Sequence, residues 1–520
     1  MVEQTRKGRR GRRGAATSEG ASSDTSSPEA RGVNYRNLVN TLPKAKAFSD
    51  DQAEHIHQTA LRVLEELGIR VLHDGAREIY RAAGAEVDEA SMMVKISPEI
   101  VASALKTAPS TFTMLGGNGR QAHFGGDNVL FASVGGPPNA IDLDRGKRPG
   151  SHSDFRDFVK LAQSFDVIHV LSPSVEPQDL ASNIRHLEVT RDQLVLTEKP
   201  FFVFSRGVEQ TKDCLEIMRL GRGLTEEQFW ANPYCYTVIN TNSPRQLDVP
   251  MCQGIIDFAK AGQPSVIAPF TLAGAMAPIT MPGALLLQHS EALMGVVLSQ
   301  LVNPGAPVVY GSFTSNVDMK SGAPAFGTPE FVRAAYGAGQ LARHVGLPWR
   351  GSAATASNAP DAQAVYETLH STWSSLLGGV NLLLHSAGWQ EGGLSASYEK
   401  FVLDIESLQI LAESFHPLGM SEADIAFEAI AEVEPGGHFF GNPHTMERFQ
   451  TAFYAPMVSD WSNFGQWTEG GSKTATERAN AIWKKTLEEF EAPPLDQGCR
   501  DAVDDYIARR ISEGGAEPLS

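Results

Sequence analysis

The segments VLFASV (129–134), DFRDFVKLAQ (154–163) and VIHVL (167–171) decide the fold that we expect. The two outer segments are short apolar runs, and the segment between them has the length and spacing of a helix. Near-continuous apolar strands are typical of a parallel sheet covered by helices on both faces. The stretch therefore predicts a strand–helix–strand unit, and the same alternation continues to residue 415.

Eight such units follow one another. The expected strands are Val129–Val134, Val167–Leu171, Phe201–Phe204, Tyr234–Asn240, Ser265–Phe270, Pro307–Gly311, Trp349–Ser352 and Asn381–His385. The expected helices are Asp154–Gln163, Asn183–Leu196, Glu209–Leu220, Pro250–Ala261, Leu285–Leu301, Pro329–Val345, Ala362–Leu377 and Ser395–Ser414. Eight units of this length predict an α/β protein with a (β/α)8 TIM barrel over residues 129–415. An open doubly wound sheet is the alternative, but the prolines in Val134–Asn139 remove amide donors that a phosphate-binding turn needs.

The barrel is flanked by other segments. Residues 1–32 are rich in Gly, Arg and Ser and are expected to form a disordered basic arm. Residues 33–128 predict a small α+β unit, whose first helix follows the capping residue Ser49. Residues 416–520 predict a helical extension that packs on the barrel, with a helix over Ser421–Val433.

Composition restricts the class of protein. The net charge of −17 makes nucleic acid an unsuitable partner for the folded body, although the arm carries clustered arginines. No apolar run reaches the roughly 18 residues of a membrane span, so Leu285–Leu301 is expected to be a buried helix. The four cysteines are widely spaced and form no CxxC pair, which favours a reducing, cytoplasmic location.

Active sites of (β/α)8 barrels lie at the carboxyl ends of the strands. In this chain those ends carry no nucleophile elbow and no HxH or HExxH spacing, so we expect no protein-bound metal. Aromatic rings are frequent there instead, and ring faces attract quaternary ammonium groups. The predicted substrate-binding residues are Phe270, Tyr310, Phe313, Trp349, Arg350, Trp389, Asn240 and Asn242.

Three of the polar residues at these strand ends suggest more specific roles. Arg350 and His385 are placed to hold a carboxylate, which arginine binds with a bidentate fork. We assign His385 and Glu391 as the catalytic candidates. The alternatives are that the rings fill the core, that His385 is a hydrogen-bonded core histidine, and that Glu391 and Arg350 form ordinary ion pairs.

Several ordered segments resemble the trimethylamine methyltransferase family. They are Leu301–Ser312, Asp318–Gly322, Gly327–Glu330, Pro360–Gln363, His385–Gly388 with Glu391, and Gly441–Thr445. The resemblance implies a barrel enzyme that moves a methyl group from a methylated amine to the cobalt of a corrinoid (a cobalamin) on a partner protein. It also implies a likeness to family founders that carry pyrrolysine on strand seven, where this chain has Ala353 and Ala354.

An alanine there cannot react with an amine. A quaternary ammonium does not need such activation, because its leaving group is a neutral amine, and attack by Co(I) then depends mainly on positioning. The chain therefore resembles the subgroup that acts on glycine betaine and related betaines. The alternatives are a tetrahydrofolate-linked demethylase on the same barrel and a non-catalytic betaine-binding protein; a homo-oligomer is expected in each case.

Overall fold

The computed structural model describes residues 31–519, so nearly all of the expected basic arm lies outside the described residues. The described chain forms two compact units. The larger unit comprises residues 34–418 and 456–519, and the smaller one residues 31–33 and 419–455. The predicted division at residues 128 and 415 stays a prediction.

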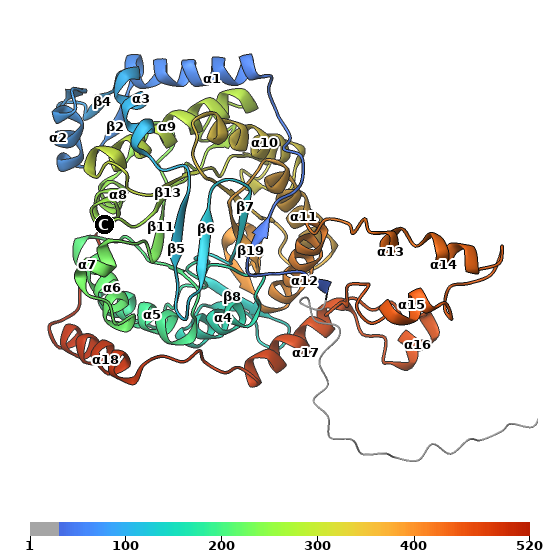
Figure 1. The fold of residues 1–520 in the computed structure, drawn as a ribbon. Helices are drawn as coiled ribbons and strands as arrows, with labels where there is room; N and C mark the ends of the chain where they lie inside the picture. The colour runs from blue at the N-terminus through green and yellow to red at the C-terminus, as the bar shows by residue number, and fades with distance from the viewer. Residues whose placement is uncertain (1–30, 520) are drawn as a thin grey trace, which may run out of the picture. The chain divides into compact units, whose positions relative to one another are not determined.

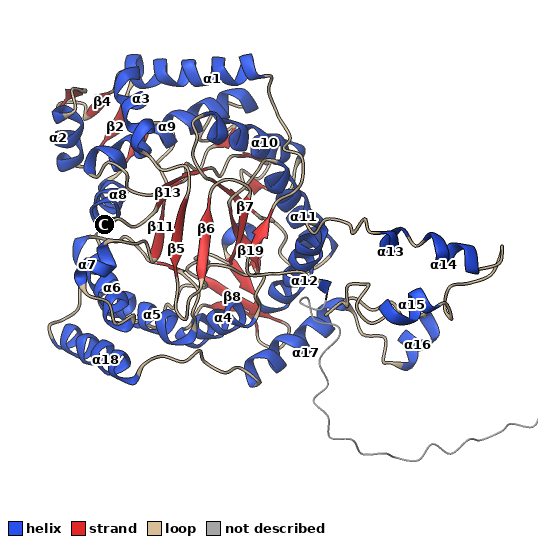
Figure 2. Cartoon of the chain, in the orientation of Figure 1, coloured by secondary structure: helices blue, strands red, loops and turns tan. Residues whose placement is uncertain are grey.

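The larger unit is built on a mostly parallel sheet surrounded by helices (Figures 1 and 2). The strand order is β1-β7-β19-β18-β15-β13-β11-β10, and only β1 pairs with its neighbour in the antiparallel sense. These strands are β1 (Leu38–Val39), β7 (Asn128–Ser133), β10 (Phe201–Phe202), β11 (Cys235–Ile239), β13 (Ser265–Ile267), β15 (Val308–Gly311), β18 (Trp349–Ser352) and β19 (Leu382–Ala387). Seven of the eight strands expected from the sequence are present, and β18 has the expected bounds.

The expected closed barrel is only partly realised. The predicted strand Val167–Leu171 forms no strand, and the segment makes only isolated bridges, from Val170 to Ala132 and from Leu171 to Phe201. The reason is local. A turn follows Phe165, and Pro173 ends the segment, so few residues remain that can pair with β7 on one side and β10 on the other. The sheet is therefore curled into a half-barrel, and its strand ladder does not close.

Helices cover the outer face of the sheet. They are α4 (His152–Ser164), α5 (Ser182–Leu196), α6 (Val208–Gly221), α8 (Val249–Lys260), α9 (Met281–Val302), α10 (Pro329–His344), α11 (Ala362–Leu377) and α12 (Tyr398–Ser414). Each lies within a few residues of its expected place. The exception is the start of α12, since residues 395–397 pair as a strand with residues 139–141 and Ser397 caps the helix. Helix α9 is long and apolar enough to span a membrane, but it is mostly buried in the core, as expected.

The inner face of the sheet forms a continuous hydrophobic core. Inward side chains such as Leu130, Val266, Val309 and Leu382 meet there, as in the layered interior of a barrel. The hairpin of β5 (Phe112–Leu115) and β6 (Gln121–Phe124) adds Met114, Ala122 and Phe124 to the same cluster. One end of the curled sheet is thus filled by apolar side chains, which leaves the other end for a ligand.

The N-terminal segment packs beside this sheet. Helix α1 (Asp50–Arg62) begins with the capping box of Ser49, and α2 (Asp74–Ala82) and α3 (Pro98–Thr107) pack on α9 together with it. A small sheet joins β2 (Ile69–Val71), β3 (Glu86–Asp88) and β4 (Met93–Lys95) to β12 (Gln246–Leu247). Because β12 follows β11, this sheet is fastened to the main one.

The smaller unit contains α13 (Glu422–Ile425), α14 (Phe427–Glu432) and α15 (Pro443–Arg448). The single helix expected over Ser421–Val433 is wrong, since Ala426 has a left-handed backbone (φ +58°) and divides it. In the larger unit, α16 (Phe464–Glu469) is followed by α17 (Ala475–Glu488), which packs on α12 and α4. Helix α18 (Gln497–Ser512) packs on α6 and α5.

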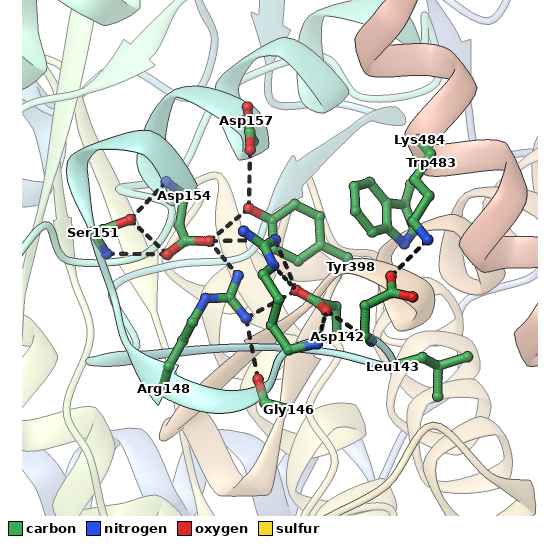
Figure 3. A network of polar contacts seen from close by, with 12 residues as sticks. Asp142, Leu143, Gly146, Arg148, Ser151, Asp154, Asp157, Tyr398, Trp483 and Lys484 are labelled. Atoms are coloured by element: carbon green, nitrogen blue, oxygen red, sulfur yellow. Dashed lines mark hydrogen bonds and ion pairs between the residues drawn. The ribbon is translucent and has the colours of Figure 1, made fainter.

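A second small sheet lies beyond the carboxyl ends of β7 and β19. It orders β20 (Trp389–Gln390), β21 (Ser395–Ser397), β8 (Asn139–Asp142) and β9 (Gly146–Pro149). A polar network fastens it to α4 and α12 (Figure 3). The Tyr398 hydroxyl lies 2.8 Å from Asp154 Oδ1 and 3.3 Å from Asp157 Oδ2, and Arg148 pairs with both Asp142 and Asp154.

Replacing Tyr398 with Phe tests this network. The variant keeps the ring and removes a hydroxyl that, within residues 31–519, reaches both Asp154 and Asp157, so a buried carboxylate loses a partner. We expect the free energy of unfolding to fall by about 1–3 kcal/mol, measured by urea denaturation. Tyr366→Phe is the matched control, because Tyr366 is 51% exposed, and an equal loss in both variants would contradict the assignment.

Candidate functional site

A cavity of about 350 Å³ opens at the carboxyl ends of the strands. Residues from most of the strand ends line it: Gly135, Gly136, Ser172, Pro173, Phe202, Phe204, Ser205, Arg206, Tyr236, Thr237, Val238, Asn240, Met251, Phe313, Arg350, Leu384, His385 and Trp389. The volume lies in the range of about 300–1,000 Å³ that is usual for small-molecule sites. The cavity thus lies at the carboxyl ends of the strands, where the active site is expected from the sequence.

Arg350 provides a buried positive charge in this cavity. It lies on β18 with only 2% of its surface exposed, and Nη1 donates to the carbonyl oxygen of Ser312 at 2.9 Å. The guanidinium carbon is 5.2 Å from the centre of the Phe313 ring. Among the described residues Nε has no hydrogen-bond partner. Burial lowers the pKa of Arg350 to about 10, so it stays charged at neutral pH with donors left for a ligand.

Arg206 is the second charged side chain in the wall. Its guanidinium lies 4.8 Å from the centre of the Phe204 ring and 3.5 Å from Glu176, and its side chain is 43% exposed. Every lining residue is described, and no Asp or Glu is among them. The lining side chains thus carry a net positive charge, which Glu176 partly offsets at Arg206 but not at Arg350, and an anionic ligand group is favoured beside Arg350.

His385 is held in the cavity by an irregular backbone. The pairing of β19 with β7 shifts register between Leu383 and Ala387, and His385 has a left-handed backbone (φ +63°). Such bulges re-aim a side chain. Nδ1 lies 2.6 Å from Ser352 Oγ. Burial, with a further effect from the charge of Arg350, lowers the pKa of His385 well below its usual value, so the ring is neutral at physiological pH.

The aromatic set predicted from the sequence is only partly assembled. Phe313 and Trp389 line the cavity, but Phe313 stacks on Phe326 with centroids 5.4 Å apart, and Trp389 stacks on His385 at 3.8 Å. Phe270 contacts Phe313 at 5.0 Å without lining the cavity. The ring faces of these residues are thus largely used within the protein.

Tyr310 and Trp349 do not reach the cavity. Successive side chains of a strand point to opposite faces. On β18 Arg350 points inward, so Trp349 points outward, where its Nε1 donates to Ser312 Oγ at 2.9 Å. On β15 Val309 belongs to the inner core, and the Tyr310 hydroxyl lies behind the sheet, 2.7 Å from His289 Nδ1.

Of the remaining predicted residues, one lines the cavity and the others do not. Asn240 lines the cavity, whereas the Asn242 side chain bonds to Asp248. Glu391 lies outside the lining and pairs with Lys147 at 2.6 Å and with Ser395. Burial raises the pKa of Glu391, but these hydrogen bonds outweigh it and hold the pKa below its usual value. Ala353 and Ala354 are fully buried and do not line the cavity.

Sequence reasoning missed three rings that line the cavity, Phe202, Phe204 and Tyr236. Phe202 lies edge-on to Phe204 at 4.7 Å and to Tyr236 at 5.7 Å. Their strands carry Phe at 201 and 202 and Tyr at 234 and 236, and only the register tells which residues face inward. In the part of the chain that the structure describes, no group of His, Cys, Asp and Glu is arranged to hold a metal, and all four cysteines are free.

The model of the trimethylamine methyltransferase (MTTB) family matches residues 6–515. The chain belongs to this family of methyltransferases. A protein of Desulfitobacterium hafniense strain Y51, glycine betaine methyltransferase, is 34% identical over 482 residues, which cover 92% of this chain and 99% of the relative. Trimethylamine methyltransferase MttB of Methanosarcina barkeri is 29% identical over 459 residues, or 86% of this chain and 92% of the relative. The crystal structure of the M. barkeri monomethylamine methyltransferase MtmB aligns with a TM-score of 0.46 and 10% identity, over 88% of this chain and 97% of that one.

Because His385 is neutral in the folded protein, the free energy of unfolding should depend on pH. In the unfolded chain a histidine takes up its proton near pH 6.5, whereas His385 in the cavity takes it up only at a much lower pH. The unfolded state thus binds more protons below pH 6.5, and the free energy of unfolding falls as the pH decreases, by up to about 1.4 kcal/mol per pH unit for this residue.

The comparison of wild type with His385→Asn by urea denaturation at pH 7.5, 6.5 and 5.5 isolates this contribution. Other buried histidines, such as His169 and His289, contribute to the same trend in both proteins, so the difference in slope reports on His385 alone. The variant is expected to lose less stability on acidification. Parallel slopes would show that His385 has the same pKa in the folded and unfolded protein and would contradict the prediction.

Proposed function

We propose that the protein transfers a methyl group from glycine betaine or a related betaine to the Co(I) of a corrinoid carried by a partner protein. The single observation that carries the proposal is the charge of the cavity wall. Arg350 and Arg206 line it, and no acidic side chain does. A betaine has a carboxylate that these arginines can bind, whereas choline and trimethylammonium bring only positive charge into an electropositive site.

The depth of Arg350 gives the substrate an orientation. Its buried Nε and the remaining guanidinium donors suit a carboxylate, which restores partners to a buried charge. His385 adds a donor from Nε2 when Ser352 donates its hydroxyl proton to Nδ1. The quaternary ammonium then lies towards Phe202 and Tyr236, whose rings attract it, since the Phe204 ring already contacts the Arg206 guanidinium. In this arrangement His385 positions the substrate.

Demethylation of a quaternary ammonium requires no proton donor, and the side chains of the cavity wall supply none. A quaternary ammonium leaves as a neutral amine and needs no proton, and the neutral His385 and the paired Glu391 supply none. The buried Ala353 and Ala354 offer no group that reacts with an amine. A bound corrinoid supplies the nucleophilic cobalt. It is far larger than a cavity of about 350 Å³, so a partner protein would present it at the mouth.

The substitution Arg350→Gln tests the carboxylate contact. Because hydrogen bonds to charged groups contribute about 1.5–3 kcal/mol, kcat/KM for glycine betaine should fall by about 10–100-fold. The measurement is methyl-Co(III) formation from Co(I) cobalamin, followed by absorbance, with glycine betaine, choline and tetramethylammonium as methyl donors. Wild type should use only the betaine, and the variant should discriminate less between betaine and choline.

Arg77→Gln is the matched control, since Arg77 is also a buried arginine but pairs with Asp74 and Glu89 away from the cavity. It should leave the substrate preference unchanged. Turnover of choline by wild type as fast as of betaine would refute the proposal. Tight betaine binding without methyl transfer would indicate a binding protein, and a requirement for tetrahydrofolate instead of cobalamin would indicate a folate-linked demethylase.

The smaller unit supports the further proposal of a homo-oligomer. Eight of its large apolar side chains are at least half exposed: Met420, Ile425, Phe427, Ile430, Phe440, Met446, Phe449 and Phe453. Among the described residues of this unit only Val33, Ala429 and Asn442 are buried. Apolar surfaces of this extent mark interaction sites. These side chains need a binding partner that buries them permanently. A second copy of the chain meets this need better than a partner that binds transiently.

The double substitution Phe427→Ser with Phe440→Ser tests this proposal. It removes two rings that are 68% and 82% exposed, and it should shift the protein towards the monomer in size-exclusion chromatography with light scattering. Trp230→Ser is the control, because Trp230 is 50% exposed on the larger unit. A wild-type monomer at micromolar concentration would contradict the proposal.

A further inference from the structure

The C-terminal tail, residues 515–519, lies along the loop that carries Arg206. The backbone amide of Leu519 donates to the carbonyl oxygen of Arg206 at 2.9 Å. Gly207 faces the same residue: it has a left-handed backbone (φ +108°), and a Cβ placed there would lie 3.1 Å from Leu519 Cβ. The tail thus contacts the two consecutive residues that lead from the cavity wall into α6.

The tail is itself held at a second point. The Ala516 amide donates to the carbonyl oxygen of Asn183 at 2.8 Å, and Gln210 Nε2 donates to the Ala516 carbonyl oxygen at the same distance. Asn183 Nδ2 donates to the Gly514 carbonyl oxygen at 2.7 Å. Ala516 is buried. These contacts fix the tail to the starts of α5 and α6, on either side of the Arg206 loop.

Helix α18, which precedes the tail, packs on α6 (Figure 1). A buried carboxylate on α6, that of Asp213, anchors it. Arg510 Nε and the Tyr506 hydroxyl both lie 2.7 Å from Asp213 Oδ1, and His186 Nε2 lies 2.9 Å from Oδ2. A charged group with several partners of good geometry makes a firm attachment. The tail therefore leaves a fixed helix end and reaches a fixed position at the loop.

The loop makes side-chain contacts near the cavity: Thr237 Oγ1 donates to Ser205 Oγ at 3.3 Å, and the Arg206 guanidinium lies 3.5 Å from Glu176. Residues 203–206 belong to no helix or strand. The Val203 amide bonds to the Tyr236 carbonyl oxygen, and the Gly207 carbonyl oxygen accepts from Thr211 in the first turn of α6. Between these points, Arg206 carries the more exposed of the two positive charges in the wall. A small rotation of this backbone moves its guanidinium relative to Phe204 and the mouth.

We infer that the C-terminal tail, through its bond to the Arg206 carbonyl, positions the Arg206 guanidinium at the cavity mouth and so sets the affinity for a carboxylated substrate. This inference rests on the proposed function, because the substrate supplies the anion. Arg206 reaches the more exposed part of the cavity and Arg350 the buried part. Betaines with a longer spacer between ammonium and carboxylate should therefore depend on the tail more than glycine betaine does.

The experiment deletes residues 516–520 from the full chain and combines the deletion with Arg206→Gln. KM and kcat are measured with glycine betaine and with a longer betaine, a four-carbon ammonium carboxylate. The deletion is expected to raise KM for the longer betaine about tenfold, as the loss of one charge-assisted contact does, and to leave kcat unchanged. In the Arg206→Gln background it should have no further effect, because the two changes act on one interaction.

Hydrogen exchange by mass spectrometry gives a readout that does not need a substrate. The amides of residues 204–208 should exchange faster in the deletion variant than in wild type, and those of α9 should not change. Lys212→Gln is the control, since Lys212 is exposed on α6 and pairs only with Glu209.

Each result decides the inference. An equal rise in KM in both backgrounds, or unchanged exchange in residues 204–208, overturns it. A fall in kcat and melting temperature with constant KM shows a merely structural tail and overturns it too. If wild type uses no betaine, the proposed function fails, and the exchange comparison alone decides whether the tail holds the loop.

Discussion

The buried charge of Arg350 is the interaction on which the site depends. A charge that is taken out of water costs free energy unless partners surround it. Here the protein supplies a carbonyl oxygen from Ser312 and the face of Phe313, but no carboxylate. The charge is thus incompletely compensated within the chain. We propose that an anionic substrate group completes it, and a preference for a carboxylate would then follow from the arrangement of the protein itself.

The fold explains how this charge can be kept. Arg350 is fixed by β18, which pairs with β15 and β19 on either side. The bulge in β19 places the neutral His385 beside it, and that neutrality avoids a second buried positive charge. The small sheet beyond β7 and β19, held by the network around Tyr398, contributes Trp389 to the cavity wall. Stability elsewhere in the chain therefore supports an energetically costly site, as is common for functional residues.

Much of the architecture could be predicted from hydrophobic spacing. Segments such as Trp349–Ser352 and Ala362–Leu377 have the expected bounds because burial and capping are local properties. The absence of the second strand could not be predicted, since whether Val167–Leu171 forms a strand or only isolated bridges depends on how neighbouring segments turn. The site shows the same limit. Of the residues singled out by their position at a strand end, Arg350, His385 and Asn240 line the cavity, whereas the direction of Trp349 and Tyr310 depends on register.

A crystal structure of the protein with glycine betaine tests the central claim most directly. The account predicts that the carboxylate oxygens lie within hydrogen-bonding distance of the Arg350 guanidinium, with Nε among the donors. It also predicts that the trimethylammonium group contacts the rings of Phe202 and Tyr236. A ligand bound in the opposite sense, with its ammonium beside Arg350, or a cavity that stays empty at saturating betaine, would contradict the account.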